Sequence, residues 1–299
     1  MKRVFMLPNF IIVGAPKAGT TSLYHYLSEH PQVFMSEPKE VNFFSKDEIE
    51  EQGLYYQDFK AKDLDSYEKL FDKGIDKKAV GEGSVSYLFY PETPAKIKAL
   101  LPAVKIIMLL RDPVARGYSH YLMDYRLGLV DVPYKEIVLK TSTHKNAHLY
   151  YQQYVELGLY YEQVKRYLEL FGKEQVKIYF QEDLRQDTQK IIFDLYEFLE
   201  IDPSNIPNIE REHNAFSMPK SNVVHKLYTS YFIRTLLSVV FPEALKEKIK
   251  NELFERKKKP ALEENLREQL LDIYRQDIQN LESFLNKDLS VWYEEITNA

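Results

Sequence analysis

Short apolar runs recur along the first two-thirds of the chain, and each is too brief for a helix of ordinary length. A continuous apolar run bounded by turn residues is typical of a strand buried on both faces of a parallel sheet. We therefore predict buried strands at the following segments: Asn9–Val13, Pro31–Met35, Ala79–Gly81, Lys105–Leu110 and Val176–Phe180.

Amphipathic segments with helical spacing separate these runs. In the first of them Leu23, Tyr26 and Leu27 fall on one face, and Thr20 is placed to cap the helix start. Strands that alternate with helices indicate an α/β fold, a P-loop-type open parallel sheet flanked by helices. The predicted helices cover these ranges: Thr20–His30, Pro94–Leu101, Ala115–Leu127, Tyr160–Phe171 and Thr188–Leu199.

Neither an internal repeat nor a Gly- or Ser-rich linker divides the 299 residues. We expect a single domain over 1–299, with a nucleotide-binding core at about 9–200 and a mostly helical C-terminal part at about 222–299. The charged stretch from Ser45 to Lys78 is predicted to form surface helices and loops.

Composition narrows the classes of partner. The formal net charge is −5, so a nucleic-acid partner is not expected, and a bound anion must be held by a local cluster of cations. The chain has no cysteine, which excludes disulfides, thiolate catalysis and cysteine metal sites. No segment has the roughly 20 apolar residues of a membrane span, Tyr231–Phe241 being the nearest approach. The prediction is a cytoplasmic protein without a transmembrane segment, and its oligomeric state is left open.

The first strand is followed by Gly14-Ala-Pro-Lys17-Ala-Gly19-Thr20-Thr21 and then by a helix. Backbone N–H groups of such a turn and the positive end of the helix bind phosphate-type anions. The nucleotide triphosphatase loop has its lysine directly after the second glycine. Here Thr20 stands in that place and the lysine lies inside the loop, so a kinase-like enzyme fits less well but remains an alternative.

A second candidate anion site follows the strand that ends at Leu110. Arg111 comes next, and Ser119 lies eight residues further, on the following helix. Ligands of open α/β sheets bind at the carboxyl ends of the strands, and the arginine fork suits a phosphate. The alternative is that Arg111 pairs with Asp112 or another carboxylate.

The two motifs together resemble the PAPS-dependent sulfotransferase superfamily, particularly its bacterial and heparan-sulfate-type members. The segments Gly158-Leu-Tyr160, Gln181-Glu-Asp183-Leu and Asp288-Leu-Ser-Val-Trp292 add to the resemblance. It implies that PAPS is the co-substrate, PAP the product, and no metal is required. It also implies that the 5′-phosphosulfate is held by Lys17, Ala18, Gly19, Thr20, Thr21 and Ser22, and the 3′-phosphate by Arg111 and Ser119, with Lys220 covering the nucleotide.

Sulfuryl transfer needs positioning, a general base and a cation for the leaving oxygen. Lys17 is the predicted cation. The resemblance points to Glu40, three residues before the first phenylalanine of a Phe pair, as the base, with Glu37 in reserve; the alternative is a solvated charged loop. The histidines are weaker candidates for the base. The predicted acceptor-binding residues are Glu37, Lys39, Asn42 and Ser84.

The expected function is sulfuryl transfer from PAPS to a hydroxyl or amine, with a carbohydrate or glycolipid as the favoured acceptor. Tyrosines concentrated between Tyr118 and Tyr161 are suited to stacking on sugar rings, although tyrosines at this spacing also pack in cores. Some family members carry histidine where this chain has Asn42, which alters any acceptor contact made there. Heparan-type members carry lysine where Gly83 stands, and the loss of that charge counts against a heparin-like acceptor. A small alcohol, a polyketide or lipid hydroxyl, and a non-catalytic nucleotide-binding protein remain alternatives.

Overall fold

The computed structural model describes residues 6–55, 59–209, 217–219, 254–256 and 259–293. The chain divides into two compact units. Unit 1 comprises Met1–Pro113, Leu159–His213 and Arg275–Ala299, and unit 2 comprises Val114–Gly158 and Asn214–Tyr274. Each unit is described by itself, and the expectation of one domain over the whole chain stays a prediction.

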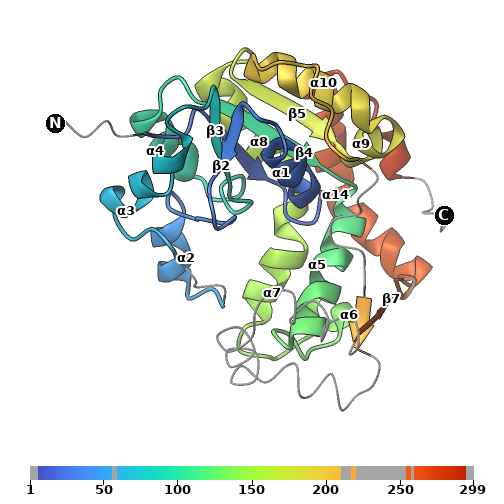
Figure 1. Cartoon of the computed structure of the whole chain (residues 1–299). Coiled ribbons are helices and arrows are strands. Elements are labelled where there is room, and N and C mark those ends of the chain that lie inside the picture. The colour runs from blue at the N-terminus through green and yellow to red at the C-terminus, as the bar shows by residue number, and fades with distance from the viewer. Residues whose placement is uncertain (1–5, 56–58, 210–216, 220–253, 257–258, 294–299) are drawn as a thin grey trace. The chain divides into compact units, whose positions relative to one another are not determined.

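Unit 1 is built on a sheet of five parallel strands in the order β2-β3-β1-β4-β5 (Figure 1). Its strands are β1 (Phe10–Gly14), β2 (Val33–Met35), β3 (Ala79–Gly83), β4 (Lys105–Leu110) and β5 (Val176–Phe180). Every residue of β1 and β3 is buried, as a sheet covered on both faces requires. The α/β fold with a parallel sheet is therefore confirmed.

Helices flank this sheet (Figure 1). Those of unit 1 are α1 (Thr20–Ser28), α2 (Lys46–Gln52), α3 (Leu64–Lys69), α4 (Thr93–Leu100), α8 (Tyr160–Phe171), α9 (Gln181–Gln186) and α10 (Thr188–Leu199), with the short 3₁₀ turns η1 (Asp72–Gly74) and η3 (Ser290–Trp292). The short helices α2 and α3 fall in the charged stretch, where surface helices and loops were expected. The Trp292 side chain is only 1% exposed and packs on Tyr160 and Phe180, which anchors the chain after α14 (Glu264–Leu285).

The strand order explains where a ligand of unit 1 would bind. From β1 the chain crosses to β2 on one side of the sheet, whereas from β3 it crosses to β4 on the other side of β1. The connections therefore diverge between neighbouring strands β1 and β4, and the carboxyl ends of such a strand pair are where open α/β sheets bind their ligands. The Gly14–Gly19 loop starts at the end of β1, and Arg111 directly follows the end of β4.

Unit 2 is mainly helical. It contains α5 (Pro113–Leu127, from its second residue), α6 (Tyr134–Val138), α7 (Ala147–Tyr154), η2 (Glu156–Gly158), the antiparallel pair β6 (Ser217–Pro219) and β7 (Phe254–Arg256), and the first half of α14 (Glu264–Leu285). The helix α14 agrees with the predicted helical C-terminal part. The apolar segment Tyr231–Phe241 lies outside the described residues, and within those described no helix combines the length and apolarity needed to cross a bilayer.

Candidate functional site

The loop between β1 and α1 is held in one shape by its own backbone. The N–H of Ala15 donates to the carbonyl of Leu109 on β4 at 2.8 Å, and the N–H of Ala18 donates back to Ala15 at 3.3 Å. A side chain at Gly14 would bring its Cβ to 2.7 Å from the Leu88 Cβ, so this position requires glycine. The loop is thus a rigid turn at the carboxyl end of β1.

The helix α1 begins differently from the prediction. Gly19, at φ 106°, is its N-cap residue, and no side chain caps the helix; Thr20 is already the first helical residue. The expected threonine cap is therefore wrong. Glycine is favoured because the left-handed conformation costs it little, and the hydroxyls of Thr20, Thr21 and Ser22 stay in the first turn, beside the N–H groups that bind anions.

Arg111 lies against the same loop. Its Nη1 donates to the backbone carbonyl of Lys17 at 2.9 Å, and its own carbonyl accepts from the Tyr160 hydroxyl at 3.0 Å. The side chain is nearly buried, and desolvation, with a smaller contribution from Arg185, lowers the pKa of Arg111. A buried guanidinium with a second cation nearby is electrostatically suited to an anion. The alternative pairing with Asp112 contributes only a weaker opposing effect.

Arg185 was missed by the sequence analysis. It lies on α9, immediately beyond β5, which is the neighbour of β4 in the sheet. Arg185 is exposed and stands among charged residues, as many surface arginines do, so the sequence around it gives no sign of a site. The strand order brings it near Arg111.

Ser119 belongs to unit 2, so its relation to Arg111 stays a prediction. Within unit 2 its hydroxyl is almost buried and accepts from Lys259 Nζ at 3.4 Å. Lys220, the predicted cover of the nucleotide, lies outside the described residues. Among the described residues, Lys259 is the lysine that contacts Ser119. It is the last residue of a basic run, Arg256 to Lys259, that was not among the predicted site residues.

Glu40 lies in the segment that follows β2. Hydrogen bonds attach it to the last residue of β3 and to the segment that follows β3. Its N–H donates to the Gly83 carbonyl at 2.9 Å, and its Oε2 accepts from the Val85 N–H at 2.8 Å. Its Oε1 pairs with Lys39 Nζ. The side chain is still 35% exposed, and each carboxylate oxygen has two lone pairs, so an acceptor proton can be received.

The backbone at this segment is strained. Glu40 and Asn42 both have positive φ, 65° and 54°. For residues other than glycine this conformation costs about 1–2 kcal/mol each. The surrounding hydrogen bonds must offset that cost, because otherwise the segment would relax.

The structure brings together Asn42 and Ser84, two of the predicted acceptor-binding residues. The Asn42 N–H donates to Ser84 Oγ at 3.0 Å, and Asn42 Oδ1 accepts from the Ser86 hydroxyl at 2.7 Å. Lys39 lies over Gly83: a Cβ there would stand 3.6 Å from Lys39 Cε, an ordinary contact. Glu37, by contrast, is exposed. Burial raises the pKa of the Tyr24 hydroxyl, and the negative charge of Glu37 adds a smaller increase.

Glu82 was also missed. It is fully buried on β3, and its carboxylate accepts from the hydroxyls of Tyr67, Ser84 and Tyr87. Burial raises the pKa of Glu82 to about 7, against the opposing effect of these hydrogen bonds. A signal was available in the sequence, since Ala79-Val-Gly-Glu82-Gly places one carboxylate inside a buried strand.

His120, one of the weaker candidates for the base, is buried in unit 2. Its Nδ1 lies 3.1 Å from the Gln153 carbonyl and its Nε2 lies 3.9 Å from Asp124. These contacts give it a role in the packing of that unit. The tyrosines of unit 2 also pack on each other: Tyr121 contacts Tyr134 and Tyr154 with ring centroids 5.0 and 5.7 Å apart.

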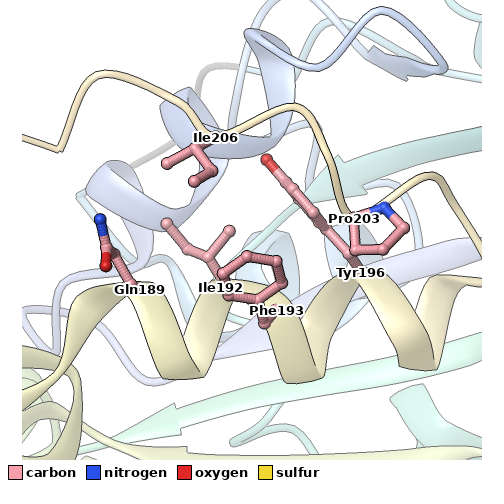
Figure 2. A pocket seen from close by; sticks show the side chains of 6 residues that line it. All are labelled: Gln189, Ile192, Phe193, Tyr196, Pro203 and Ile206. Atoms are coloured by element: carbon pink, nitrogen blue, oxygen red, sulfur yellow. The ribbon is translucent and has the colours of Figure 1, made fainter.

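A shallow apolar depression lies elsewhere in unit 1, between α10 and the segment that follows it (Figure 2). No cation is among the residues that line it, so it does not suit a phosphorylated donor. These residues are Gln189, Ile192, Phe193, Tyr196, Pro203 and Ile206.

Comparison with known proteins agrees with this geometry. Residues 7–283 match the family model described as "Sulfotransferase domain". A sulfotransferase from Alicyclobacillus acidocaldarius has a solved structure that superposes with a TM-score of 0.71 at 30% identity, covering 97% of this chain and 100% of that one.

Two curated relatives match this chain over a smaller part of its length. The membrane-associated sulfotransferase kil1 of Dictyostelium discoideum is 35% identical over 40% of this chain, and the bifunctional heparan sulfate N-deacetylase/N-sulfotransferase 4 of Mus musculus is 27% identical over 66% of it. The matched part is 23% of the length of each of these relatives.

Proposed function

The chain belongs to the sulfotransferase domain family, and from this premise we propose that it transfers the sulfuryl group of PAPS to an acceptor hydroxyl or amine, releasing PAP. The observation that carries the proposal is the hydrogen bond from Arg111 to the Lys17 carbonyl. It joins the two anion-binding motifs, which are 94 residues apart in the sequence. A nucleotide with phosphate at both its 5′ and 3′ positions needs such a pair.

The donor's phosphosulfate would be held by the loop and first turn of α1, from Lys17 to Ser22, where N–H groups, hydroxyls and the positive helix end converge. Arg111 would bind the 3′-phosphate, with Arg185 adding to the positive potential around it. Ser119 is proposed to bind the 3′-phosphate with Arg111, as the resemblance implies, and Lys220 is still proposed to cover the nucleotide.

In the transfer step, the acceptor oxygen or nitrogen forms a bond to sulfur as the bond from sulfur to the 5′-phosphate oxygen breaks. The acceptor proton passes to Glu40, and Lys17 stabilises the negative charge on the departing phosphate oxygen. Lys39 and the Val85 N–H orient the Glu40 carboxylate through its two oxygens. Asn42 is proposed to contact the acceptor, whereas Ser84 is buried and is proposed to act by holding the Asn42 backbone and not by touching the acceptor as predicted.

For the acceptor, we propose a carbohydrate or glycolipid. A relative named as a heparan sulfate N-sulfotransferase supports this class. At Gly83, the space that a longer side chain would use is bordered by Lys39, so a cation is still present near the base. A small alcohol or a lipid hydroxyl remains the alternative acceptor, and the cytoplasmic location stays a prediction.

The test is a transfer screen with ³⁵S-labelled PAPS over an N-deacetylated polysaccharide, a glycolipid and a phenol, run beside calorimetry with PAP. We expect label in the polysaccharide or glycolipid and measurable heat with PAP. Failure of PAP to bind would overturn the proposed donor, and label in the phenol alone would overturn the proposed acceptor class.

Glu40→Gln tests the base in the same assay. We expect transfer to fall by about 10²-fold or more while PAP affinity is unchanged, because only the proton acceptor is lost. Glu50→Gln is the matched control: it removes an exposed carboxylate on α2, outside the candidate site, and should leave the rate within about twofold. Full turnover by Glu40→Gln would instead assign the base to Glu37 or a histidine.

A further inference from the structure

Glu82 lies at the centre of the elements that surround the candidate base. It occupies β3 with none of its surface exposed, and it is not required for any step of the proposed transfer. Its neighbours along the chain contact Glu40 directly: the Gly83 carbonyl accepts from the Glu40 N–H, and the Val85 N–H donates to the Glu40 carboxylate.

Two hydroxyls connect the Glu82 carboxylate to the backbone beyond Glu40. Ser84 Oγ donates to Glu82 Oε2 at 2.8 Å and accepts from the Asn42 N–H at 3.0 Å. Tyr87 Oη donates to both carboxylate oxygens, at 3.2 and 3.3 Å, and accepts from the Phe44 N–H at 3.4 Å. In its ionised form the Glu82 carboxylate can only accept, so it turns both hydroxyl protons toward itself and leaves their lone pairs for the two N–H groups.

Ring packing strengthens the same attachment. Tyr67 donates to Glu82 Oε1 at 2.6 Å, and its ring stacks on Phe43 with centroids 4.4 Å apart. Phe44 meets Tyr67 and Tyr87 edge to face, at 5.4 and 5.6 Å. The tyrosines oriented by Glu82 are therefore the ones on which the Phe pair after Glu40 rests.

We propose that Glu82 is a positioning residue that holds the strained 40–44 segment, and with it the candidate base Glu40, through Ser84, Tyr87 and Tyr67. The positive φ angles of Glu40 and Asn42 require such a hold. The inference rests on the proposed function, because it gives Glu82 a catalytic consequence only if Glu40 is the base.

Hydrogen exchange of the Asn42 and Phe44 amides, followed by NMR, tests the hold without an acceptor. Ser84→Ala should speed exchange at Asn42 about tenfold and leave Phe44 unchanged, since one amide loses its acceptor. Tyr87→Phe should do the reverse. Glu82→Gln should speed exchange at both, because the amide group brings a donor where two hydroxyls need acceptors. Unchanged exchange at both amides in folded Ser84→Ala and Tyr87→Phe would overturn the inference, whether or not Glu82→Gln folds.

Tyr179→Phe is the matched control. It removes another buried tyrosine hydroxyl that donates to a carboxylate, Asp194 at 2.7 Å, on β5 and α10. It should lower thermal stability, as Tyr87→Phe should, yet leave exchange at Asn42 and Phe44 unchanged. Faster exchange at these amides in Tyr179→Phe would reduce the effect of Glu82 to general destabilisation and overturn the inference.

The consequence for catalysis is measured by ³⁵S transfer from PAPS to the acceptor found in the screen. Glu82→Gln and Ser84→Ala should lower kcat about tenfold or more with KM for PAPS and PAP affinity unchanged, whereas Tyr179→Phe should keep its kcat. A wild-type kcat in both site variants, despite fast amide exchange, overturns the catalytic consequence. Absence of PAP binding with the amide pattern intact overturns the proposed function instead, so the two failures are distinguishable.

Discussion

Lys17 has a left-handed backbone, φ 65°, although it is not glycine. Its carbonyl faces Arg111, which donates to it. The hydrogen bond from Arg111 therefore holds the loop through the backbone of Lys17, and a substitution of the lysine side chain keeps that carbonyl.

Lys17→Ala should consequently lower kcat by about 10²–10³-fold, while the dissociation constant of PAP changes less than about tenfold. The physical reason is that charge develops on the departing oxygen only in the transition state. Steady-state transfer rates and PAP calorimetry measure the two effects. Equal losses in rate and affinity would mean that Lys17 binds the ground state and has no special role in transfer.

A second prediction at the scale of one residue concerns Glu82 and the dependence of stability on pH. Its pKa is raised by burial to about 7 in the native protein, against 4.5 when exposed. Between these values the native state binds more protons than the unfolded state, so stability falls as pH rises from 4.5 to about 7. The penalty is fully present above pH 7 and absent below 4.5.

Urea unfolding across this pH range, in wild type and Glu82→Gln, measures the penalty. The wild type should lose about 3 kcal/mol more than the variant between the two ends of the range, because 1.36 kcal/mol corresponds to about one pKa unit. Other groups are common to both proteins and cancel in the difference. Parallel stability curves would show that Glu82 is ionised with its ordinary pKa.

At the scale of the element, α8 shows how a helix can begin without a cap of its own. Leu159 precedes it and offers no side-chain acceptor. Instead Asp277, on α14, accepts from the N–H groups of Tyr160 and Tyr161 at 2.7 and 3.2 Å. This carboxylate satisfies orphan amides and also lies at the positive end of the helix.

Asp277→Ala should therefore lower the free energy of unfolding by about 1–2 kcal/mol, as loss of an N-cap does. Chemical denaturation measures it. Glu268→Ala, which removes an exposed carboxylate on the same helix, is the control and should change stability by less than about 0.5 kcal/mol. If both variants were equally stable, α8 would not depend on Asp277.

At the scale of the whole molecule, a ligand that binds the native state raises the free energy of unfolding. PAP at about 100 times its dissociation constant should stabilise the native protein by about 2.7 kcal/mol. Adenosine 5′-monophosphate contacts only the loop and α1 in the proposed arrangement, so it should stabilise less at the same concentration.

Arg111→Ala separates the two anion sites by the same measurement. Thermal unfolding with each nucleotide should show that the variant loses most of the shift caused by PAP and less of the shift caused by the monophosphate. Some loss with the monophosphate is expected because Arg111 also holds the Lys17 carbonyl. An equal loss with both nucleotides would contradict a separate 3′-phosphate site.

Periodicity predicted the elements closely where burial is decided locally. Helix α8 and strand β4 begin and end at the predicted residues, because a continuous apolar run or an apolar face is visible without knowledge of any partner. The Gly14–Gly19 loop was predicted for the same reason: its glycines, lysine and following helix are contiguous. The cap of α1 was mistaken because Thr20 has the right chemistry, while the turn demanded a left-handed residue one position earlier, Gly19.

By itself, then, the sequence determined the alternation of strands and helices, the Gly14–Gly19 loop between β1 and α1 and the presence of Arg111 at a strand end, since each depends on neighbouring residues only. The tertiary structure decided which distant groups meet: Arg111 with the Lys17 carbonyl, and Glu82 with the hydroxyls of Tyr67, Ser84 and Tyr87. The physical reason is that a buried polar group must find its hydrogen-bond partner wherever the strand order places one, and no local pattern in the sequence carries that information.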